Sequence, residues 1–342
     1  MSLALYVDGE RWRAHLRRTA EERPGLVPVA KGNGYGLGLH RLARRAGWLG
    51  VDTLAVGTYD EIPAVADRFD GDIVVLTPWR PFLDTSAAAT LADRVIHTVG
   101  RSEDLVALAA TGARPRVLLE ALSSMRRHGF DPSGLAAAAT VRGVRHEGVA
   151  LHLPLPGPAS VGEARALLTR AAGAPTVWVS HLSAADVAAL ADTHPGLRIR
   201  PRVGTDLWLG DRGALAVRAR VLDAHPVRRG ERFGYRQRRA VRSGTLLVVS
   251  GGTAHGIGLE APTGQSGARA RTSAAARGGL DALGLVRSPF VIDGRQPWFA
   301  EPPHMQASML FLPEGARVPG VGTEIDARVR YTATTFDRVE IS

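Results

Sequence analysis

The sequence predicts an α/β protein in which a (β/α)8 barrel is followed by a mostly antiparallel β-domain. Between residues 27 and 201, short apolar runs rich in β-branched residues alternate with Ala-, Leu- and Arg-rich stretches of helical periodicity. This alternation is typical of βα units on a parallel sheet, and the number of strand runs suits a barrel. After Gly210 the strand runs are separated by many glycines and prolines, which indicates an antiparallel β-domain.

Hydrophobic periodicity, with the glycines and prolines that interrupt it, predicts the order of the elements. In the barrel we expect strands at residues 27–30, 53–56, 72–76, 95–99, 116–120, 148–151, 176–180 and 197–201, and helices at 9–22, 39–48, 60–68, 86–92, 102–110, 132–141, 160–171 and 184–193. In the second domain we expect strands at 216–223, 244–249, 289–292 and 324–331, and an irregular loop at 263–279. We predict a barrel domain at residues 1–211 and a β-domain at residues 212–342. Assignment of the first few residues to the β-domain is the alternative.

Composition narrows the class of protein. With 342 residues, of which 45% are hydrophobic, the chain is long enough for a sizeable core. No apolar run reaches the length of a membrane span, and the N-terminus lacks a basic segment followed by a long apolar one. The absence of cysteine excludes disulfides, thiolate metal sites and a cysteine nucleophile. We therefore expect a cytoplasmic enzyme without membrane or metal partners.

The net charge of +10 raises the question of an acidic partner. Most arginines stand singly along helical segments, as on solvated faces. One cluster, between Arg228 and Arg242, contains seven arginines interleaved with Phe233 and Tyr235. Because no recognised nucleic-acid motif accompanies this cluster, we interpret it as a solvated strand-and-turn region and do not expect nucleic-acid binding.

Lys31 is the only lysine in the chain, since the other 42 of the 43 basic residues are arginines. An arginine keeps the charge of a lysine but is not an amine nucleophile, whereas lysine is one and its pKa falls readily on desolvation. Position 31 is therefore predicted to need a primary amine. Schiff-base chemistry with a carbonyl compound or with pyridoxal phosphate is the leading explanation, and a compositional accident at a solvated turn is the alternative.

The surroundings of Lys31 favour the catalytic explanation. The apolar run 26–30 predicts a buried strand that ends at Lys31. A loop with four glycines follows, and then a helix that begins near Leu39. Parallel barrels hold their active sites at the C-terminal ends of the strands, which is where this arrangement places the lysine.

The stretch Lys-Gly-Asn-Gly-Tyr-Gly-Leu-Gly at 31–38 resembles the cofactor-lysine motif of the alanine racemase family, which are fold type III pyridoxal-phosphate enzymes. Lys31, Asn33, Tyr35, Gly36 and Gly38 match that motif, whereas Gly32, Gly34 and Leu37 depart from it. The resemblance extends over nearly the whole chain, although the C-terminal end is shorter than is usual in the family. It implies pyridoxal 5'-phosphate as cofactor, an amino acid as substrate, an isomerase of amino-acid metabolism, and a homodimer with shared active sites.

The resemblance also implies which residues, besides the Schiff-base lysine, bind the cofactor. Tyr35 matches the tyrosine that binds the phosphate, and Ser183 matches a phosphate-binding serine before a helix. A stretch that begins at Arg202 resembles the family's Arg-x-Gly-x-x-x-Tyr-Gly, with one residue added before the last glycine. In that stretch Arg202 is implied to contact the pyridine nitrogen, and Gly204 and Thr205 to hold the phosphate.

An arginine at the pyridine nitrogen has a chemical consequence. Arginine is a permanent cation and a pure hydrogen-bond donor, so it leaves the ring nitrogen unprotonated. The cofactor is then a weaker electron sink, which suits proton transfer better than decarboxylation. The related decarboxylases use a glutamate at this place.

Further residues match the substrate side of the family's site. Met-Arg-Arg-His-Gly-Phe at 125–130 resembles Met-Gly-Arg-x-Gly-Phe, which implies that Arg127 steers the cofactor phenolate and the substrate carboxylate, a task that a guanidinium suits. His152 matches the histidine that supports the pyridine-side arginine, and Met305 matches a methionine at the partner's substrate site. The family's lysine that positions the arginine, often carbamylated, is replaced by Glu120, whose carboxylate we expect to hold Arg127.

The second catalytic base of the family is missing. In the racemases it is a tyrosine from the partner subunit, and Thr253 occupies that position within Gly-Thr-Ala-His-Gly at 252–256. A threonine hydroxyl is a poor general base, because effective proton-transfer groups have a pKa near the working pH. His255 is a candidate because histidine is the side chain that ordinarily changes charge near neutral pH, and Tyr235 is a weaker candidate. The aspartate that follows the family's methionine is also absent after Met305.

We predict a pyridoxal-phosphate-dependent amino-acid racemase- or epimerase-like enzyme, with its activity on alanine left open. The missing tyrosine keeps two alternatives open. One is a one-base lyase or transaminase acting on an amino acid, and the other is a racemase paralogue that binds the cofactor without turnover. These motifs do not specify the side chain of the substrate.

Overall fold

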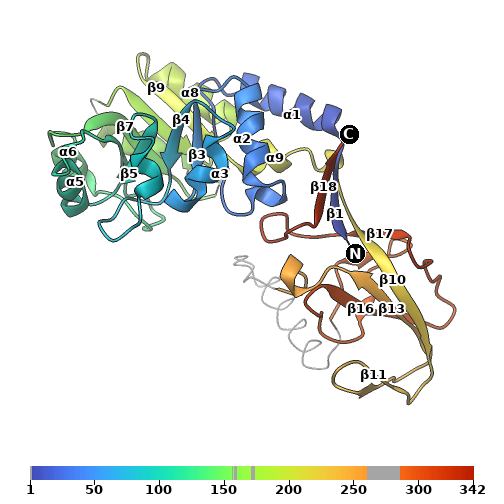
Figure 1. Cartoon of the computed structure of the whole chain (residues 1–342). Helices are drawn as coiled ribbons and strands as arrows, with labels where there is room; N and C mark the ends of the chain where they lie inside the picture. The colour runs from blue at the N-terminus through green and yellow to red at the C-terminus, as the bar shows by residue number, and fades with distance from the viewer. Residues whose placement is uncertain (1, 156, 158–159, 171–173, 260–285) are drawn as a thin grey trace. The chain divides into compact units, whose positions relative to one another are not determined.

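The computed structural model describes residues 2–155, 157, 160–170, 174–259 and 286–342, and the expected loop 263–279 lies outside them. The chain divides into two compact units (Figure 1). The barrel unit consists of Arg13–Asp211. The β-unit combines the residues through Trp12 with Arg212–Ser342.

The barrel unit is built on a parallel sheet of eight strands, with the order β2-β9-β8-β7-β6-β5-β4-β3. Strands that follow one another in sequence are therefore neighbours in the sheet, as repeated βα units require. A parallel bridge between Val29 and Ala55 brings the two edges of the sheet together, so the barrel is nearly closed. The strands are β2 (Val27–Pro28), β3 (Thr53–Val56), β4 (Asp72–Val75), β5 (Val95–Val99), β6 (Arg116–Ala121), β7 (Arg145–His152), β8 (Thr176–Ser180) and β9 (Arg198–Val203).

Amphipathic helices follow the strands along the chain. In α2, for example, the buried residues Leu42, Ala43 and Ala46 recur at the spacing of one helical face. The helices are α1 (Gly9–Glu21), α2 (Leu39–Trp48), α3 (Ile62–Ala66), α4 (Ser86–Ala89), α5 (Ser102–Ala109), α6 (Pro132–Ala138), α7 (Ser160–Arg170), α8 (Ala184–Thr193) and α9 (Thr205–Leu209), with short 3-10 helices at η1 (Gly34–Gly36) and η2 (Tyr59–Glu61).

Side chains inside the barrel form layers, because residues two apart in a strand face the same side. The apolar core layer consists of Val27, Val29, Ala55, Val74, Ile96, Leu118, Ala150 and Trp178. Two residues further along their segments, the same alternation leads to Lys31, Glu120, His152 and Ser180. A polar layer therefore lies above an apolar one, at the end of the barrel where active sites are found.

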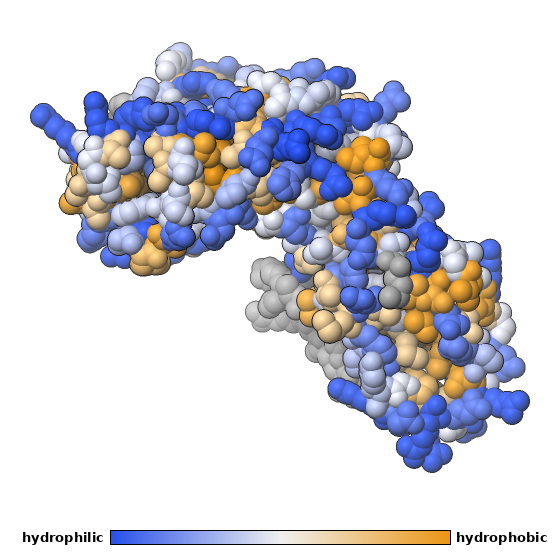
Figure 2. Space-filling model, in the orientation of Figure 1, coloured by the Kyte–Doolittle hydropathy of each residue, from blue (hydrophilic) through white to orange (hydrophobic). Residues whose placement is uncertain are grey.

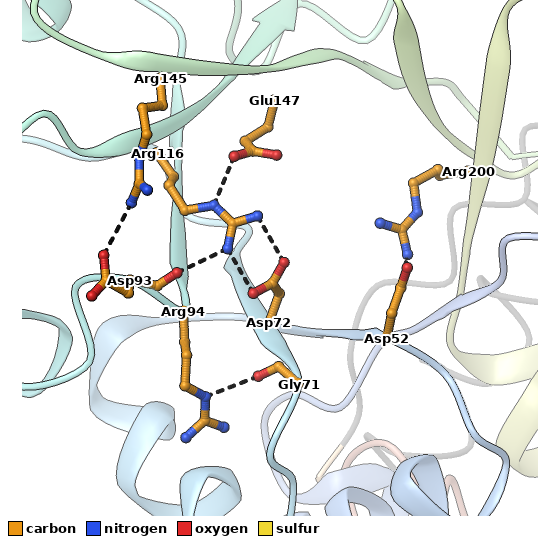
Figure 3. A network of polar contacts seen from close by, with 9 residues as sticks. All are labelled: Asp52, Gly71, Asp72, Asp93, Arg94, Arg116, Arg145, Glu147 and Arg200. Carbon is orange, nitrogen blue, oxygen red and sulfur yellow. Dashed lines mark hydrogen bonds and ion pairs between the residues drawn. The ribbon is translucent and has the colours of Figure 1, made fainter.

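Ion pairs hold the opposite end of the barrel, at the N-terminal ends of the strands (Figure 3). Arg116 donates hydrogen bonds to both carboxylate oxygens of Asp72, at 2.6 and 2.7 Å, and to Glu147 at 2.7 Å. Arg200 pairs with Asp52 in the same region. Because these pairs join strands that are far apart in sequence, they fix the base of the barrel.

The β-unit contains an eight-stranded sheet with the path β14-β17-β10-β13-β16-β15. Strand β1 pairs antiparallel with β10 and parallel with β18, and β11 and β12 form a separate hairpin. The strands are β1 (Leu3–Val7), β10 (Leu215–Val227), β11 (Arg232–Phe233), β12 (Arg238–Arg239), β13 (Gly244–Ser250), β14 (Phe290–Val291), β15 (Trp298–Phe299), β16 (Ala307–Pro313), β17 (Glu324–Ala327) and β18 (Arg338–Ile341), with 3-10 helices at η3 (Arg212–Ala214) and η4 (Thr253–His255).

The predicted fold class, a (β/α)8 barrel followed by a mostly antiparallel β-domain, is confirmed. Most expected barrel strands differ from the observed ones by one to three residues at an end. The sequence did not predict β1, β16 or β18. Strand β1 pairs with β10 about two hundred residues later, in the register Leu3↔Ala219, and this pairing has no local signal in the sequence.

Hydrophilic residues cover much of the face of each unit that Figure 2 draws. This agrees with the interpretation of the scattered arginines as residues of solvated faces. Within the described part of the chain, no helix is both long enough and apolar enough to span a membrane.

Candidate active site

Lys31 lies where strand β2 passes into a glycine-rich turn. The carbonyl of Lys31 accepts a hydrogen bond from the amide of Gly34 at 3.1 Å. Gly34 has a φ of +62°, and a Cβ there would lie 2.7 Å from the amide nitrogen of Leu39, so only glycine fits. Tyr35 adopts a φ of +56°, which is uncommon for a bulky residue. The turn thus has a specific conformation, and it leaves the Lys31 side chain exposed at the C-terminal end of the barrel.

Glu61, at the end of η2, ties this turn to the next strand. Its Oε1 accepts the amide hydrogen of Gly32 at 2.6 Å, and its Oε2 accepts that of Gly57 at 2.6 Å. Gly57 follows β3, and a Cβ there would lie 3.1 Å from Cβ of Lys31 and 3.0 Å from Oε2 of Glu61. One carboxylate therefore holds the backbone next to the lysine against the end of β3.

Tyr35 packs against Gly204, which joins strand β9 to helix α9. Tyr35 is only 5% exposed, and a Cβ on Gly204 would overlap its hydroxyl group. Trp208 of α9 donates from Nε1 to the carbonyl of Val29 at 2.8 Å. Burial raises the pKa of Tyr35, so its phenol remains a hydrogen-bond donor at neutral pH. The loops after β2 and β9 therefore meet at a glycine backbone beside a phenol.

Arg202 and Glu120 are buried together in the polar layer, 6% and 3% exposed. Arg202 Nη2 donates to the carbonyl of Leu151 at 3.2 Å, but Arg202 Nε and Glu120 Oε2 have no hydrogen-bond partner in the described part of the chain. Burial lowers the pKa of Arg202 to about 10, against the opposing effect of Glu120. Burial raises the pKa of Glu120, although Arg202 and Arg127 favour its ionised form.

His152 lies at the end of β7, beside this pair. Its Nδ1 is 2.9 Å from Oγ of Ser180, and its ring centroid is 5.0 Å from that of His181. Burial and the charges of Arg202 and Arg127 lower the pKa of His152 to about 3. The imidazole therefore stays neutral at physiological pH and adds no charge to a region that already holds two guanidinium groups.

The electrostatic surroundings of Lys31 favour its neutral amine. Although the Lys31 side chain is exposed, partial desolvation of its amine by the surrounding residues is the largest cause that lowers its pKa; Arg127 and Arg202 lower the pKa further, and Glu61 raises it. Arg127 itself is exposed, and among the described residues it makes no hydrogen bond or ion pair. The expected contact between Glu120 and Arg127 is thus not a hydrogen bond, although the charge of Arg127 favours the ionised form of Glu120.

Ser183 and Thr205 begin the helices that follow β8 and β9. Ser183 caps α8: its hydroxyl accepts the Asp186 amide hydrogen at 3.1 Å, and its backbone amide donates to Asp186 Oδ2 at 3.2 Å. This reciprocal pair is a capping box, which explains the serine without a ligand. Thr205 is exposed as the first residue of α9. The phosphate contacts predicted for both residues stay predictions.

The remaining predicted residues, Thr253, His255 and Met305, lie in the β-unit. His255 is 8% exposed, with Nε2 at 3.1 Å from Asp337 and Nδ1 accepting a backbone amide hydrogen at 3.2 Å. Thr253 is half-buried, and its amide donates to the carbonyl of His304 at 2.8 Å. Met305 is 72% exposed. Both ring nitrogens of His255 are occupied, so its geometry is that of a supporting residue.

The sequence did not single out Glu61 or Ser180 as site residues. Glu61 had a local signal, since the Thr-x-x-Glu spacing at 58–61 is typical of a capping box. That signal predicts a helix start, however, and not the bond to Gly32, which is 29 residues away in the chain. Ser180 had no signal beyond its place as the last residue of a strand.

The fold and the polar layer define a class: a barrel joined to a β-domain, with one lysine in a polar layer that also contains a buried arginine and a buried glutamate. Residues 7–207 match the family model for the alanine racemase N-terminal domain. The chain therefore belongs to the alanine racemase family.

Solved structures of racemases share this fold along their whole length. The alanine racemase of Bartonella henselae, solved with covalently bound pyridoxal phosphate, is 16% identical with a TM-score of 0.74, covering 100% of both chains. The alanine racemase of E. faecalis is 20% identical with a TM-score of 0.71, covering 99% of this chain and 98% of that one. A histidine racemase from Leuconostoc mesenteroides subsp. sake is 18% identical with a TM-score of 0.68, covering 99% and 97%. No curated protein sequence matches the chain.

Proposed function

We propose that the protein is a pyridoxal-phosphate-dependent amino-acid racemase or epimerase in which Lys31 binds the cofactor. One observation carries the proposal: the only lysine of an arginine-rich chain lies at the C-terminal end of the barrel, in the polar layer that contains the buried Glu120, and Glu61 holds the backbone beside it. Membership of the alanine racemase family supports the same chemistry.

The residues present fit pyridoxal phosphate. Arg202 Nε is a buried donor without a partner among the described residues, as a contact to a pyridine nitrogen requires. Gly204 offers its backbone beside the Tyr35 hydroxyl, at a position where a Cβ would overlap that hydroxyl, and this suits a phosphate cradle. When bound, the cofactor supplies an electron sink for the electrons released at the substrate Cα.

Lys31 is suited to move the Cα proton on one face of the substrate. Its lowered pKa increases the fraction of neutral amine at a given pH, and only the neutral amine accepts a proton. With the cofactor bound, Arg202 would donate a hydrogen bond to the ring nitrogen without giving it a proton, which would favour proton transfer over decarboxylation. His152 remains neutral and preserves the position of Arg202 without adding charge.

We also propose a homodimer in which the β-unit of one subunit serves the substrate face opposite Lys31 of its partner. Inversion at Cα needs a proton to leave one face and another to arrive on the opposite face. A single amine on one face does not perform both steps, so a second acid/base group is needed. The resemblance to the family supports Thr253, His255 and Met305 as residues at that face.

The single lysine allows a direct test. The purified protein is loaded with pyridoxal phosphate, reduced with borohydride, and digested, and the labelled peptide is located by mass. The loaded protein is then incubated with L- and D-amino acids in deuterated water, and Cα deuterium and enantiomer composition are followed. We expect the label on Lys31 and exchange with inversion, and we expect the Lys31→Arg variant to lose both. A label only at the N-terminal amine, or no exchange with any amino acid, would refute the proposal.

The replacement of the family's tyrosine by Thr253 favours a second candidate, a one-base lyase or transaminase. The same incubation separates the candidates. Exchange with retention of configuration, or the appearance of a keto acid, would support the one-base enzyme. A labelled Lys31 without any exchange would support a paralogue that binds the cofactor without turnover.

A further inference from the structure

The β-unit contains a histidine held by a buried carboxylate. His304 Nε2 lies 2.6 Å from Oε1 of Glu301, and Glu301 is only 3% exposed. The other carboxylate oxygen, Oε2, accepts the amide hydrogen of Tyr235 at 2.9 Å. The Tyr235 ring centroid is 4.5 Å from that of His304. A carboxylate with both oxygens occupied orients its imidazole more firmly than an exposed one does.

The backbone of His304 is fixed as well. Its carbonyl accepts the amide hydrogen of Thr253 at 2.8 Å, and its amide donates to the carbonyl of Ala307 at 2.9 Å. A Cβ on Gly252 would overlap the His304 carbonyl, so the two segments are in close contact. His304 is therefore preorganised at both its backbone and its side chain, directly beside Thr253.

The ring nitrogens of His304 and His255 differ in what they are free to do. In His255 both nitrogens have protein partners, Asp337 and a backbone amide. In the neutral form of His304, a hydrogen on Nε2 that Glu301 accepts leaves a lone pair on Nδ1, and no hydrogen bond to Nδ1 is found among the described residues. The His304 side chain is 28% exposed, so a ligand has access to it.

We propose that His304, oriented by Glu301, is the acid/base group that the β-unit of one subunit supplies to the substrate face opposite Lys31 of its partner. This assignment rests on the proposed function. In one direction Nδ1 of His304 accepts the Cα proton, and the Lys31 ammonium group returns a proton to the opposite face. In the other direction the two groups exchange roles. Each then re-equilibrates with solvent, so no proton is gained or lost in the cycle.

The decisive variant is His304→Gln, studied as the cofactor-loaded full chain with single enantiomers in deuterated water. Glutamine keeps an amide near Nε2 for Glu301 but lacks a basic nitrogen at Nδ1. We expect inversion to fall about 10²- to 10⁴-fold, the usual contribution of a general acid/base. Exchange of the enantiomer whose Cα proton faces Lys31 should persist, and this persistence shows that the variant is folded and loaded.

His225 supplies a matched control. It also pairs with a carboxylate, with Nε2 at 3.2 Å from Asp223, but its side chain is 59% exposed and that of Asp223 is 56% exposed. The His225→Gln variant should therefore invert substrate at the rate of the unchanged protein. Glu301→Gln should reduce inversion less than His304→Gln does, because the ring keeps its nitrogen and loses only the carboxylate that orients it.

A measurement without cofactor or substrate tests the geometry itself. The ¹⁵N shifts of His304 in the cofactor-free protein should report the hydrogen on Nε2, and Glu301→Gln should redistribute it between the nitrogens. A hydrogen on Nδ1 in the unchanged protein, or unaltered inversion in His304→Gln, would overturn the assignment. So would loss of inversion in Tyr235→Phe alone. Absence of inversion in the unchanged protein refutes the proposed function, whereas inversion that His304→Gln leaves unaltered refutes only the role of His304.

Discussion

Replacing Glu61 with glutamine removes a negative charge beside Lys31 and nearly preserves the shape of the side chain. The carboxylate accepts the amide hydrogens of both Gly32 and Gly57 at 2.6 Å. Glutamine has one acceptor oxygen, and its NH2 group would face the second amide hydrogen. The variant therefore loses one hydrogen bond to a charged acceptor and leaves a backbone donor without its partner.

Two effects follow, on stability and on the amine. A hydrogen bond to a charged group contributes about 1.5–3 kcal/mol. Because Glu61 is half-buried and Gly32 is exposed, water replaces part of that bond, so we expect the free energy of unfolding to fall by about 1–2 kcal/mol. For a unit of the size of Arg13–Asp211, this lowers Tm by about 2–8 °C. The pKa of Lys31 should also fall, since the Glu61 carboxylate raises it.

The single lysine makes the amine measurable. Reductive methylation with ¹³C-formaldehyde labels only Lys31 and the N-terminal amine, so an NMR titration of the cofactor-free protein follows Lys31 directly. Glu61→Asp keeps the charge but is too short to reach both amides, and it should lower Tm while changing the Lys31 titration less. Asp60→Asn removes a neighbouring exposed charge and should change neither quantity.

Two results would contradict this reasoning. One is a Lys31 titration that stays in place or moves to higher pH in Glu61→Gln. The other is an equal decrease in Asp60→Asn, which would assign the effect to general charge rather than to the hydrogen-bonded carboxylate.

Three further predictions concern the barrel unit. Gly204→Ala should destabilise it by about 1–3 kcal/mol in urea unfolding and weaken cofactor binding, because the new Cβ displaces the Tyr35 hydroxyl; an unchanged urea midpoint would contradict the close packing. Burial lowers the pKa of His97 to about 4. The free energy of unfolding should therefore be constant above about pH 6.5 and fall by about 3 kcal/mol toward pH 4, because the unfolded chain binds a proton that the folded one does not. The His97→Gln variant should show a weaker dependence on pH. Arg116→Lys should cost about 1–3 kcal/mol because it loses the two-bonded carboxylate contact, whereas Arg145→Lys, in an exposed pair, should cost less than about 0.5 kcal/mol; equal costs would contradict the role of the buried pair.

The barrel was predictable because the sequence patterns of its strands and helices are each contained in a short stretch of the chain. Each buried strand is a short apolar run, and each helix repeats its apolar residues at a period that a short window reveals. Strand ends were less predictable, because the residue at which pairing stops depends on the neighbouring strand. Strand β1 shows what a local pattern does not predict. Its partner β10 is far along the chain, so neither the pairing nor its register has a local cause.

Short motifs in the sequence predicted three residues of the candidate site, and the roles of these residues stay predictions. Lys31, Tyr35 and Arg202 belong to short patterns whose residue types are tied to one cofactor, and the structure brings their loops together at the C-terminal end of the barrel. The contacts around them had no such pattern. Glu61 reaches Gly32 across 29 residues, and Glu301 reaches the amide of Tyr235 across 66 residues.

By itself, the sequence determined which chemical groups are available: one primary amine, no thiol, many guanidinium groups and few imidazoles. It also determined the strand-and-helix alternation that builds a barrel. Only the tertiary structure decided which groups act together. Closure of the barrel placed the Glu61 carboxylate on the backbone beside Lys31, and packing of the β-unit occupied both nitrogens of His255 but left Nδ1 of His304 without a described partner. Such contacts depend on burial and on distances between remote segments, which a local pattern of residues does not contain.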